Sequence, residues 1–263
     1  MTDLYYEVYG EGVPVVFAHG IGGNHASWFQ QVPFFSTFCQ AITFDHRGFG
    51  NSRELGGGAD RSKFVEDLRE LFDHLGITKA ALVAQSMGGG TCANFAVRYP
   101  ERDSALVLAD TLVGLALPES IQSQMDAVRK ATADLPQLVR VLSPKFRDHE
   151  PVLTHLYTEI NNFNLGARKN TRGTLGEGAT VQQLTDTRIP ILFLVGSEDI
   201  LFPPDLVMRI HRMISGSQYK EVRGAGHSVY FEQPNSFNDA VLTFLKASSV
   251  LTSPKEAQSV SHG

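Results

Sequence analysis

Short apolar runs, separated by stretches with helical periodicity, constrain the fold of this chain most strongly. The runs span residues 13–18, 41–44, 80–84, 105–109 and 191–195. Each run is almost continuously hydrophobic, which is typical of strands that helices cover on both faces. Because these strands alternate with helices through short connections, the sequence predicts an α/β fold with a doubly wound, mostly parallel sheet.

The segments around these runs complete the predicted core. Residues 4–9 predict an edge strand, and residues 219–222 predict a last strand. Apolar residues at helical spacing predict helices over 64–75, 87–99 and 237–245.

One segment interrupts the alternation of strands and helices. From Thr111 to Thr187 the sequence shows only amphipathic helical patches and no strand pattern. We therefore expect a core of residues 1–110 and 188–247, with residues 111–187 inserted as a helical cap over the carboxyl edge of the sheet. The Ser-rich residues 248–263 are expected to form a disordered tail.

Composition and charge argue against several classes of function. The net charge is −5 without a block of Lys or Arg, so neither nucleic acid nor a membrane surface is an expected partner. No membrane-spanning apolar run and no signal-peptide pattern is found, so we expect a cytoplasmic protein. Cys39 and Cys92 predict buried free thiols rather than a disulfide, and no Cys/His cluster has the spacing of a zinc site.

The strongest chemical signal is Ala84-Gln85-Ser86-Met87-Gly88, where a predicted strand ends and a helix begins. It matches the nucleophile-elbow pattern, with Ala84 in place of the first glycine. The turn brings strand and helix close together, so the residues two before and two after the serine must be small. We interpret Ser86 as a nucleophile; a serine that only caps a glycine-rich helix is the plainer alternative.

A nucleophilic serine needs a base and an acid that orients the base. His227 follows the last predicted strand, and Asp199 follows the strand before it. Open α/β sheets place their sites at such carboxyl ends, and the order Ser, Asp, His is the one expected for this kind of chain. We therefore predict His227 as the base and Asp199 as the acid, and no metal ligands.

Two other carboxylates compete for the role of the acid. Glu198 is adjacent to Asp199, and Asp110 ends an earlier strand. We prefer Asp199 because its loop continues into Phe202-Pro203-Pro204, as expected of the loop that carries the acid.

Stabilising a tetrahedral intermediate requires backbone N–H groups aimed at one point. Met87 begins the helix after Ser86 and supplies one candidate donor, which the helix dipole supports. The loop His19-Gly20-Ile21-Gly22-Gly23 follows the first long strand, and Ile21 is the second predicted donor. We interpret His19 as a structural residue that bonds the backbone of this loop.

Together these motifs resemble the α/β-hydrolase family over almost the whole chain. The resemblance rests, in order, on His19-Gly20 followed by Trp28, on 45–52 (Asp-His-Arg-Gly-Phe-Gly-Asn-Ser), on the elbow, and on the loops of Asp199 and His227. It implies the α/β-hydrolase fold, a serine hydrolase and a scaffold role for the segment of Asp45 and Arg47. These motifs are much more specific for the fold than for a substrate.

Within that family, Ser86 argues against the haloalkane dehalogenases and epoxide hydrolases, which use an Asp nucleophile. The chain resembles enol-lactone hydrolases, cofactor-free perhydrolases and small carboxylesterases. Meta-cleavage product hydrolases share the Ser-Met-Gly-Gly run, but Ser228 stands where they usually carry Trp. We expect hydrolysis of a small, fairly apolar ester or lactone through an acyl-enzyme, without a cofactor. Carbon–carbon bond hydrolysis of a diketone or vinylogous acid, or a ligand-sensor role, stays open; the sequence predicts no oligomeric state.

The insertion is expected to provide substrate specificity. Its apolar residues either line a pocket or attach the insertion to the core; they are Leu112, Val113, Leu115, Leu117, Ile121, Met125 and Val128. Trp28, Ile200 and Val229 are predicted to contribute to the substrate pocket, with core packing as the alternative for Trp28.

Overall fold

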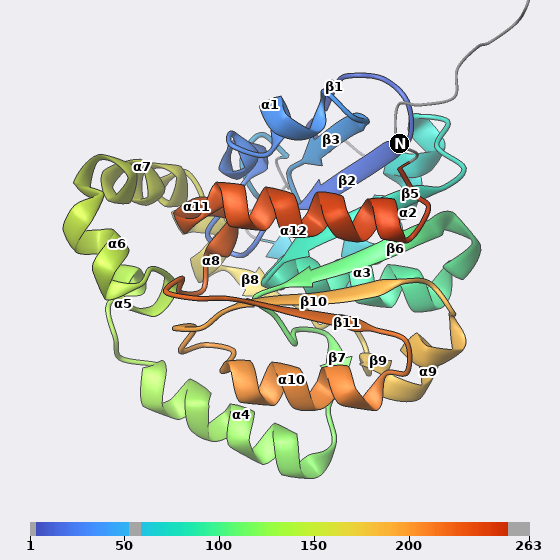
Figure 1. Ribbon diagram of the computed structural model, residues 1–263. Helices are drawn as coiled ribbons and strands as arrows, with labels where there is room; N and C mark the ends of the chain where they lie inside the picture. The colour runs from blue at the N-terminus through green and yellow to red at the C-terminus, as the bar shows by residue number, and fades with distance from the viewer. Residues whose placement is uncertain (1–3, 53–58, 252–263) are drawn as a thin grey trace, which may run out of the picture.

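The computed structural model describes residues 4–52 and 59–251, and these residues form a seven-stranded sheet flanked by helices (Figure 1). The strand order is β1-β3-β2-β5-β6-β10-β11. The strands are β1 (Tyr6–Tyr9), β2 (Pro14–Ala18), β3 (Gln40–Phe44), β5 (Ala80–Gln85), β6 (Asp103–Ala109), β10 (Ile191–Gly196) and β11 (Gln218–Val222). Only β1 pairs antiparallel, so the predicted mostly parallel sheet is confirmed.

Helices cover both faces of this sheet. One face carries α2 (Phe64–His74), α3 (Met87–Arg98) and α10 (Pro204–Met213). The other face carries α1 (Val32–Phe35) and α12 (Pro234–Ala247). The sheet is therefore doubly wound, as the sequence predicts.

The packing of β2 explains why its sequence is continuously hydrophobic. Val16 and Ala18 belong to the apolar layer under α2 and α3, whereas Val15 and Phe17 belong to the layer under α12. All four side chains have no exposed surface. Burying an aliphatic or aromatic side chain of this kind contributes about 1.5–3 kcal/mol, so both layers stabilise the strand.

The segment from Thr111 to Thr187 is mainly helical. Its helices are α4 (Glu119–Thr132), α5 (Gln137–Val141), α6 (Pro144–His149), α7 (Pro151–Asn162), α8 (Leu165–Lys169) and α9 (Val181–Asp186). It also contains very short strands that the sequence does not predict: β7 (Leu115–Ala116), β8 (Thr171–Arg172) and β9 (Ala179–Thr180). β7 pairs with β9, and β8 pairs with β4 (Ala59–Asp60). A strand of two residues has too little pattern to be recognised by alternation of polarity.

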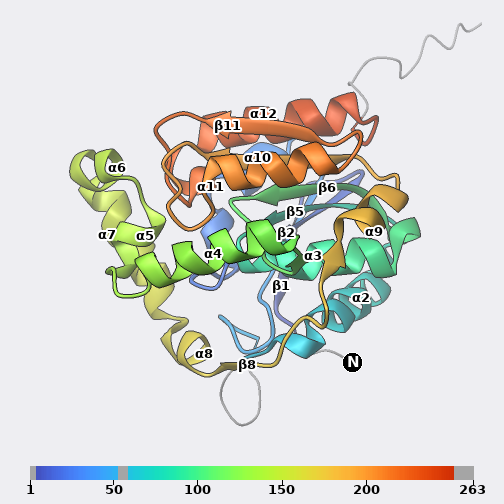
Figure 2. The same cartoon turned by 90° about the horizontal axis from the view of Figure 1, so that it is seen from below.

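The first part of the insertion is attached to the core by apolar contacts. Ile121 and Met125 of α4 are buried in the same apolar layer as Leu206 of α10. Figure 2 shows α4 at the front, over the side that carries α10 and α3. Leu112 and Leu115 are buried in this layer too, so these residues connect the insertion to the core.

The second part of the insertion lies beyond one end of the sheet. In both Figure 1 and Figure 2, helices α5, α6 and α7 lie to the left of the strands. Within the described residues, no helix combines the length and the apolar character that a membrane span requires.

The chain end differs from the expected disordered tail at its first residues. After α12, the backbone N–H groups of Val250 and Leu251 donate to the carbonyl of Leu245, and the Leu251 side chain is buried. The tail prediction is therefore wrong for residues 248–251, and residues 252–263 lie outside the described part. Cys39 and Cys92 are free and buried, as predicted, and burial raises the pKa of Cys39 to about 12.

Candidate active site

Ser86 occupies a sharp turn between β5 and α3. Its backbone φ is 49°, a left-handed value that a residue with a side chain rarely adopts and that costs about 1–3 kcal/mol. The Ser86 N–H donates to the carbonyl of Ala109 at 3.0 Å, and Gly89 N–H donates to the carbonyl of Ser86 at 2.9 Å. A Cβ added to Gly88 would lie 2.4 Å from the carbonyl oxygen of Ala18. The elbow is thus strained and is held by hydrogen bonds to its neighbours. It requires a small residue two positions after the serine, where Gly88 lies.

His227 and Asp199 meet at the carboxyl ends of β11 and β10. His227 Nδ1 lies 2.9 Å from Asp199 Oδ2, and both side chains are buried. Because a carboxylate only accepts, Nδ1 carries the hydrogen in this contact and Nε2 is left able to accept. Asp199 Oδ1 accepts the N–H groups of Leu201 and Phe202, at 2.7 and 3.0 Å. The ring of Phe202 stacks on the imidazole with 5.6 Å between centroids.

The competing carboxylates are placed differently. Glu198 is exposed. Asp110 is buried and accepts the N–H groups of Gly196 and Val229, at 3.0 and 3.2 Å, so it connects the two loops instead of contacting the imidazole. Burial, and then the charge of Asp199, raise the pKa of Asp110 well above its usual range. The geometry favours Asp199 as the partner of His227.

The Ile21 loop packs tightly against the elbow. A Cβ added to Gly20 would lie 2.1 Å from Gln85 Oε1 and 3.2 Å from Ser86 Cβ. Within residues 4–52 and 59–251, the backbone N–H groups of Ile21 and Met87 donate to no acceptor. Ile21 lines the cavity with Ser86, and Met87 follows Ser86 in the chain, so both predicted donors lie near the serine with N–H groups that no acceptor in the described residues takes.

His19 anchors this loop, as the sequence analysis expects. Its Nδ1 donates to the carbonyl of Gly20 at 2.8 Å, and its Nε2 accepts the N–H of His46 at 3.0 Å. Burial lowers the pKa of His19, so the ring is neutral and both of its nitrogens are used for structure. His19 has no nitrogen free to act as a base.

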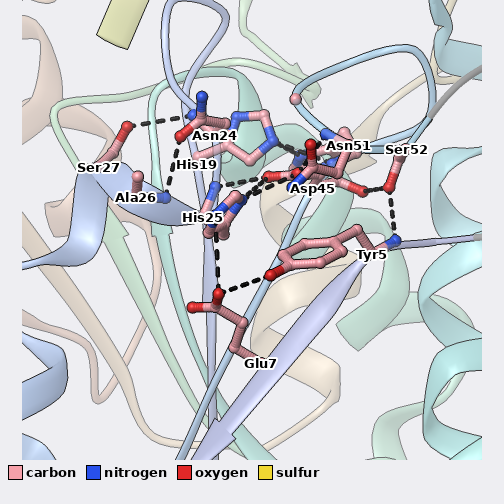
Figure 3. Close-up of polar contacts among 12 residues, drawn as sticks. Tyr5, Glu7, His19, Asn24, His25, Ala26, Ser27, Asp45, Asn51 and Ser52 are labelled. Carbon is pink, nitrogen blue, oxygen red and sulfur yellow. Dashed lines mark hydrogen bonds and ion pairs between the residues drawn. The ribbon is translucent and has the colours of Figure 1, made fainter.

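A polar network surrounds Asp45, next to His19 (Figure 3). Asp45 Oδ1 accepts the N–H of His25 at 2.6 Å, and Oδ2 accepts the N–H of Asn51 at 2.7 Å. The hydroxyl of Ser52 donates to the Asp45 carbonyl and accepts the N–H of Tyr5. All these contacts are local to the scaffold, in agreement with the structural role expected for Asp45.

A cavity of about 110 Å³ lies beside Ser86. Its lining comprises Gly20, Ile21, Gly22, Gly23, Gln85, Ser86, Gln137, Arg140, Val141, Tyr157, Arg168, Leu201, His227 and Tyr230. The cavity thus brings Ser86, His227 and the Ile21 loop together, with Asp199 behind the histidine. The Ser86 hydroxyl makes no hydrogen bond within the described residues. A larger hollow of about 650 Å³ along β11 and α12 is lined by neither Ser86 nor His227, so it lacks this chemistry.

The residues predicted for the substrate pocket lie outside this lining. Trp28 has no exposed surface and packs against Tyr230, with 4.8 Å between ring centroids. Val229 is fully buried, and Ile200 is 38% exposed. Successive side chains point in different directions both in the loop of Ile200 and in the short helix α11 (Val229–Glu232), and the neighbours Leu201 and Tyr230 line the cavity instead.

Polar side chains of the insertion also reach the cavity, and the sequence analysis does not identify them. These are Gln137 and Arg140 from α5, Tyr157 from α7, and Arg168 from α8. Analysis by hydrophobic pattern alone assigns polar helical residues to solvent. Only the packing of α5 against α7 and α8 brings them together.

A parallel α/β sheet with a serine at a strained strand–helix turn, and with an aspartate–histidine pair at neighbouring strand ends, defines a class of hydrolases. The chain belongs to the alpha/beta hydrolase fold family, whose model matches residues 13–234. It is therefore a member of an enzyme family, and the fold predicted from its motifs is confirmed.

Known proteins similar to this chain span nearly its full length. A protein of Synechocystis sp. provisionally named a non-heme chloroperoxidase is 30% identical over 266 residues, covering 93% of this chain and 95% of its own. The 3-oxoadipate enol-lactonase 2 of Acinetobacter baylyi is 26% identical, covering 92% and 93%. The structure of a malate-bound thermophilic esterase from Thermogutta terrifontis matches with a TM-score of 0.77 at 26% identity, covering 93% of both chains.

Proposed function

We propose that this protein hydrolyses small carboxylic esters or lactones through an acyl-enzyme on Ser86. One observation carries the proposal: a serine at a strained turn and the histidine of a buried aspartate–histidine pair line the same cavity. Similarity to an esterase and to an enol-lactonase supports the same reaction class.

The proposed reaction begins when His227 Nε2 accepts the proton of Ser86 Oγ. The serine oxygen attacks the carbonyl carbon, and the N–H groups of Ile21 and Met87 bind the resulting oxyanion. His227 then donates the proton to the departing alcohol, and Asp199 stabilises the transient imidazolium. Water repeats the sequence on the acyl-enzyme and releases the acid. In a lactone, the alcohol stays attached to the acyl group.

The size of the cavity favours small substrates. A volume of about 110 Å³ lies below the roughly 300–1,000 Å³ of sites for drug-sized ligands. Ile21, Val141 and Leu201 provide apolar lining, whereas Gln137 and the arginines provide a polar side. We therefore infer a compact acyl group with both apolar and polar parts, which modifies the expected fairly apolar substrate.

Turnover of short-chain esters and lactones by the purified protein tests the proposal. Replacing Ser86→Ala should lower turnover by about 10⁴-fold or more, since the nucleophile is removed. Ser123→Ala, on the exposed face of α4, is the matched control and should leave turnover unchanged. Ester hydrolysis that persists in Ser86→Ala would contradict the proposal, and so would cleavage confined to carbon–carbon bonds.

A further inference from the structure

Two arginines of the insertion line the cavity without a carboxylate partner. Arg140 lies on α5 and Arg168 on α8, and both are half-buried. Within the described residues, neither guanidinium forms an ion pair with an Asp or Glu side chain. Half-buried arginines usually pair with an acid, because removing a charge from water is costly. Their position in the lining of the cavity beside Ser86 therefore needs an explanation.

A chain of neutral amide groups holds Arg168 in place. Arg168 Nη1 donates to Gln137 Oε1, and Gln137 Nε2 donates to Asn161 Oδ1. Asn161 in turn donates to the carbonyl of Tyr157 at 2.7 Å. Arg140 Nε is buried without a hydrogen-bond acceptor. This amide chain fixes the direction of Arg168 but leaves both positive charges uncompensated.

The two charges also lie close enough to repel each other. Burial lowers the pKa of Arg168; Tyr157 acts in the opposite direction, and the charge of Arg140 lowers this pKa again. A guanidinium is not deprotonated in proteins at neutral pH. A bound anion would supply the hydrogen-bond acceptor and the opposite charge that the cavity lacks.

We propose that Arg140 and Arg168 bind a carboxylate carried by the substrate, so that the preferred substrates are anionic esters or lactones. This inference rests on the proposed hydrolysis at Ser86. A guanidinium presents parallel N–H donors that match the two oxygens of a carboxylate. The cavity is small and must also hold the scissile group, which favours a compact carboxylate. Monoesters of short dicarboxylic acids, esters of hydroxy acids and lactones with a carboxylate side chain all meet this description.

Matched substrate pairs test the inference. The first pair is the mono-4-nitrophenyl ester of glutaric acid and its neutral carboxamide analogue. The second is 4-acetoxybenzoate and 4-acetoxybenzamide, in which the charge lies on the departing group. After correction for spontaneous hydrolysis, kcat/KM should be at least about 10-fold higher for the anionic member of at least one pair.

Variants then assign this preference to the arginines. Arg140→Gln and Arg168→Gln should each reduce the ratio of anionic to neutral kcat/KM by about 10- to 100-fold. The corresponding Arg→Lys variants should retain part of the ratio, since they keep the charge but lose the paired donors. Arg129→Gln removes an arginine of α4 whose side chain is 62% exposed, and should leave the ratio unchanged. A ratio near one in both pairs, or a ratio that neither Gln variant changes, would overturn the inference.

Calorimetry separates this inference from the proposed reaction. Glutarate should bind to the Ser86→Ala protein, and Arg140→Gln added to that protein should weaken binding at least about 10-fold, whereas neutral glutaramide should not bind measurably. Arginine-dependent glutarate binding without any ester turnover would retain the anion site and reject the hydrolase proposal. Ser86-dependent turnover of neutral esters without glutarate binding would reject the anion site alone.

Discussion

The two walls of the active-site cavity are built in different ways. The core wall consists of the elbow, the Ile21 loop and the loops of Asp199 and His227, and backbone hydrogen bonds and close glycine contacts hold it. The insertion wall consists of side chains on separate short helices, joined by an amide chain from Gln137 to Asn161.

This difference suggests a division of roles. A wall fixed by backbone contacts keeps reacting groups in position with little reorganisation, which favours transition-state stabilisation. A wall made of side chains on helices can change its charge and shape without disturbing the sheet. We therefore expect changes in the core wall to affect every substrate, and changes in the insertion wall to affect the choice among substrates.

The largest effect should come from Asp199→Asn in the core wall. Since Asp199 Oδ1 accepts two backbone N–H groups, the amide oxygen of Asn should take that place and its NH2 should face Nδ1, which moves the His227 hydrogen to Nε2. Turnover should therefore fall by about 10³- to 10⁴-fold for anionic and neutral esters alike. Steady-state kinetics on both substrate pairs measures this loss. Glu198→Gln, at the exposed neighbouring position, is the control and should retain turnover. A loss restricted to anionic esters would contradict the expectation that changes in the core wall affect every substrate.

A smaller but still general loss is expected from Gly20→Ala. The new Cβ would lie 2.1 Å from Gln85 Oε1 and 3.2 Å from Ser86 Cβ, so either the Gln85 side chain or the loop that carries the Ile21 N–H must shift. Losing one oxyanion donor costs about 10²- to 10³-fold in kcat, and partial displacement should cost about 10- to 100-fold. Gly166→Ala in α8 is the control, because nothing lies within 4 Å of its added Cβ. Equal kcat in both variants would contradict a role for the loop.

Gln137→Glu should change selectivity through the insertion wall. The new carboxylate would compensate the charge of Arg168, so the preference for anionic esters should fall by about 10-fold. The ratio of kcat/KM within each matched pair measures this change. A preference that stays intact would show that the charge of the arginines does not select the substrate.

Asp103→Asn should have the smallest effect on turnover, within about 2-fold. Asp103 begins β6 and does not line the cavity. Burial raises the pKa of Asp103 from 3.8 to about 8, and its Oδ2 has no hydrogen-bond donor among the described residues. Because the folded-state pKa is the higher one, its stabilising contribution is complete below pH 3.8 and is lost as the pH rises through about 8.

Denaturant unfolding across this pH range measures the effect. In the wild-type protein, the contribution of Asp103 to the free energy of unfolding should decrease as the pH rises from about 4 to 8, by a few kcal/mol at most. Asp103→Asn should remove that decrease. An unchanged pH dependence in the variant would show that Asp103 is charged in the folded protein.

The core wall could be anticipated from the sequence because each of its parts follows a strand. Buried parallel strands leave long apolar runs, and their carboxyl ends meet at one edge of the sheet, so Ser86, Asp199 and His227 could be placed together by topology alone. The structure brings Ser86 and His227 to one cavity, with Asp199 bonded to His227, and their catalytic roles stay a proposal.

The insertion wall could not be anticipated in the same way. Arg140 and Arg168 lie on different short helices, and only the tertiary packing of those helices brings both to the cavity that Ser86 lines. Local patterns also fail to separate a large aromatic residue in a pocket from one in the core, as Trp28 illustrates. The buried Leu251 similarly depends on contacts with α12 that a Ser-rich sequence does not reveal.

The most direct test of a nucleophilic Ser86 is covalent labelling by a fluorophosphonate, followed by mass spectrometry of the intact protein and its peptides. The reagent phosphonylates a serine that an adjacent base activates, and fluoride leaves. The proposed mechanism predicts one phosphonyl group per chain, attached to Ser86 and strongly reduced in His227→Ala. An unlabelled Ser86, or labelling that does not depend on His227, would contradict it.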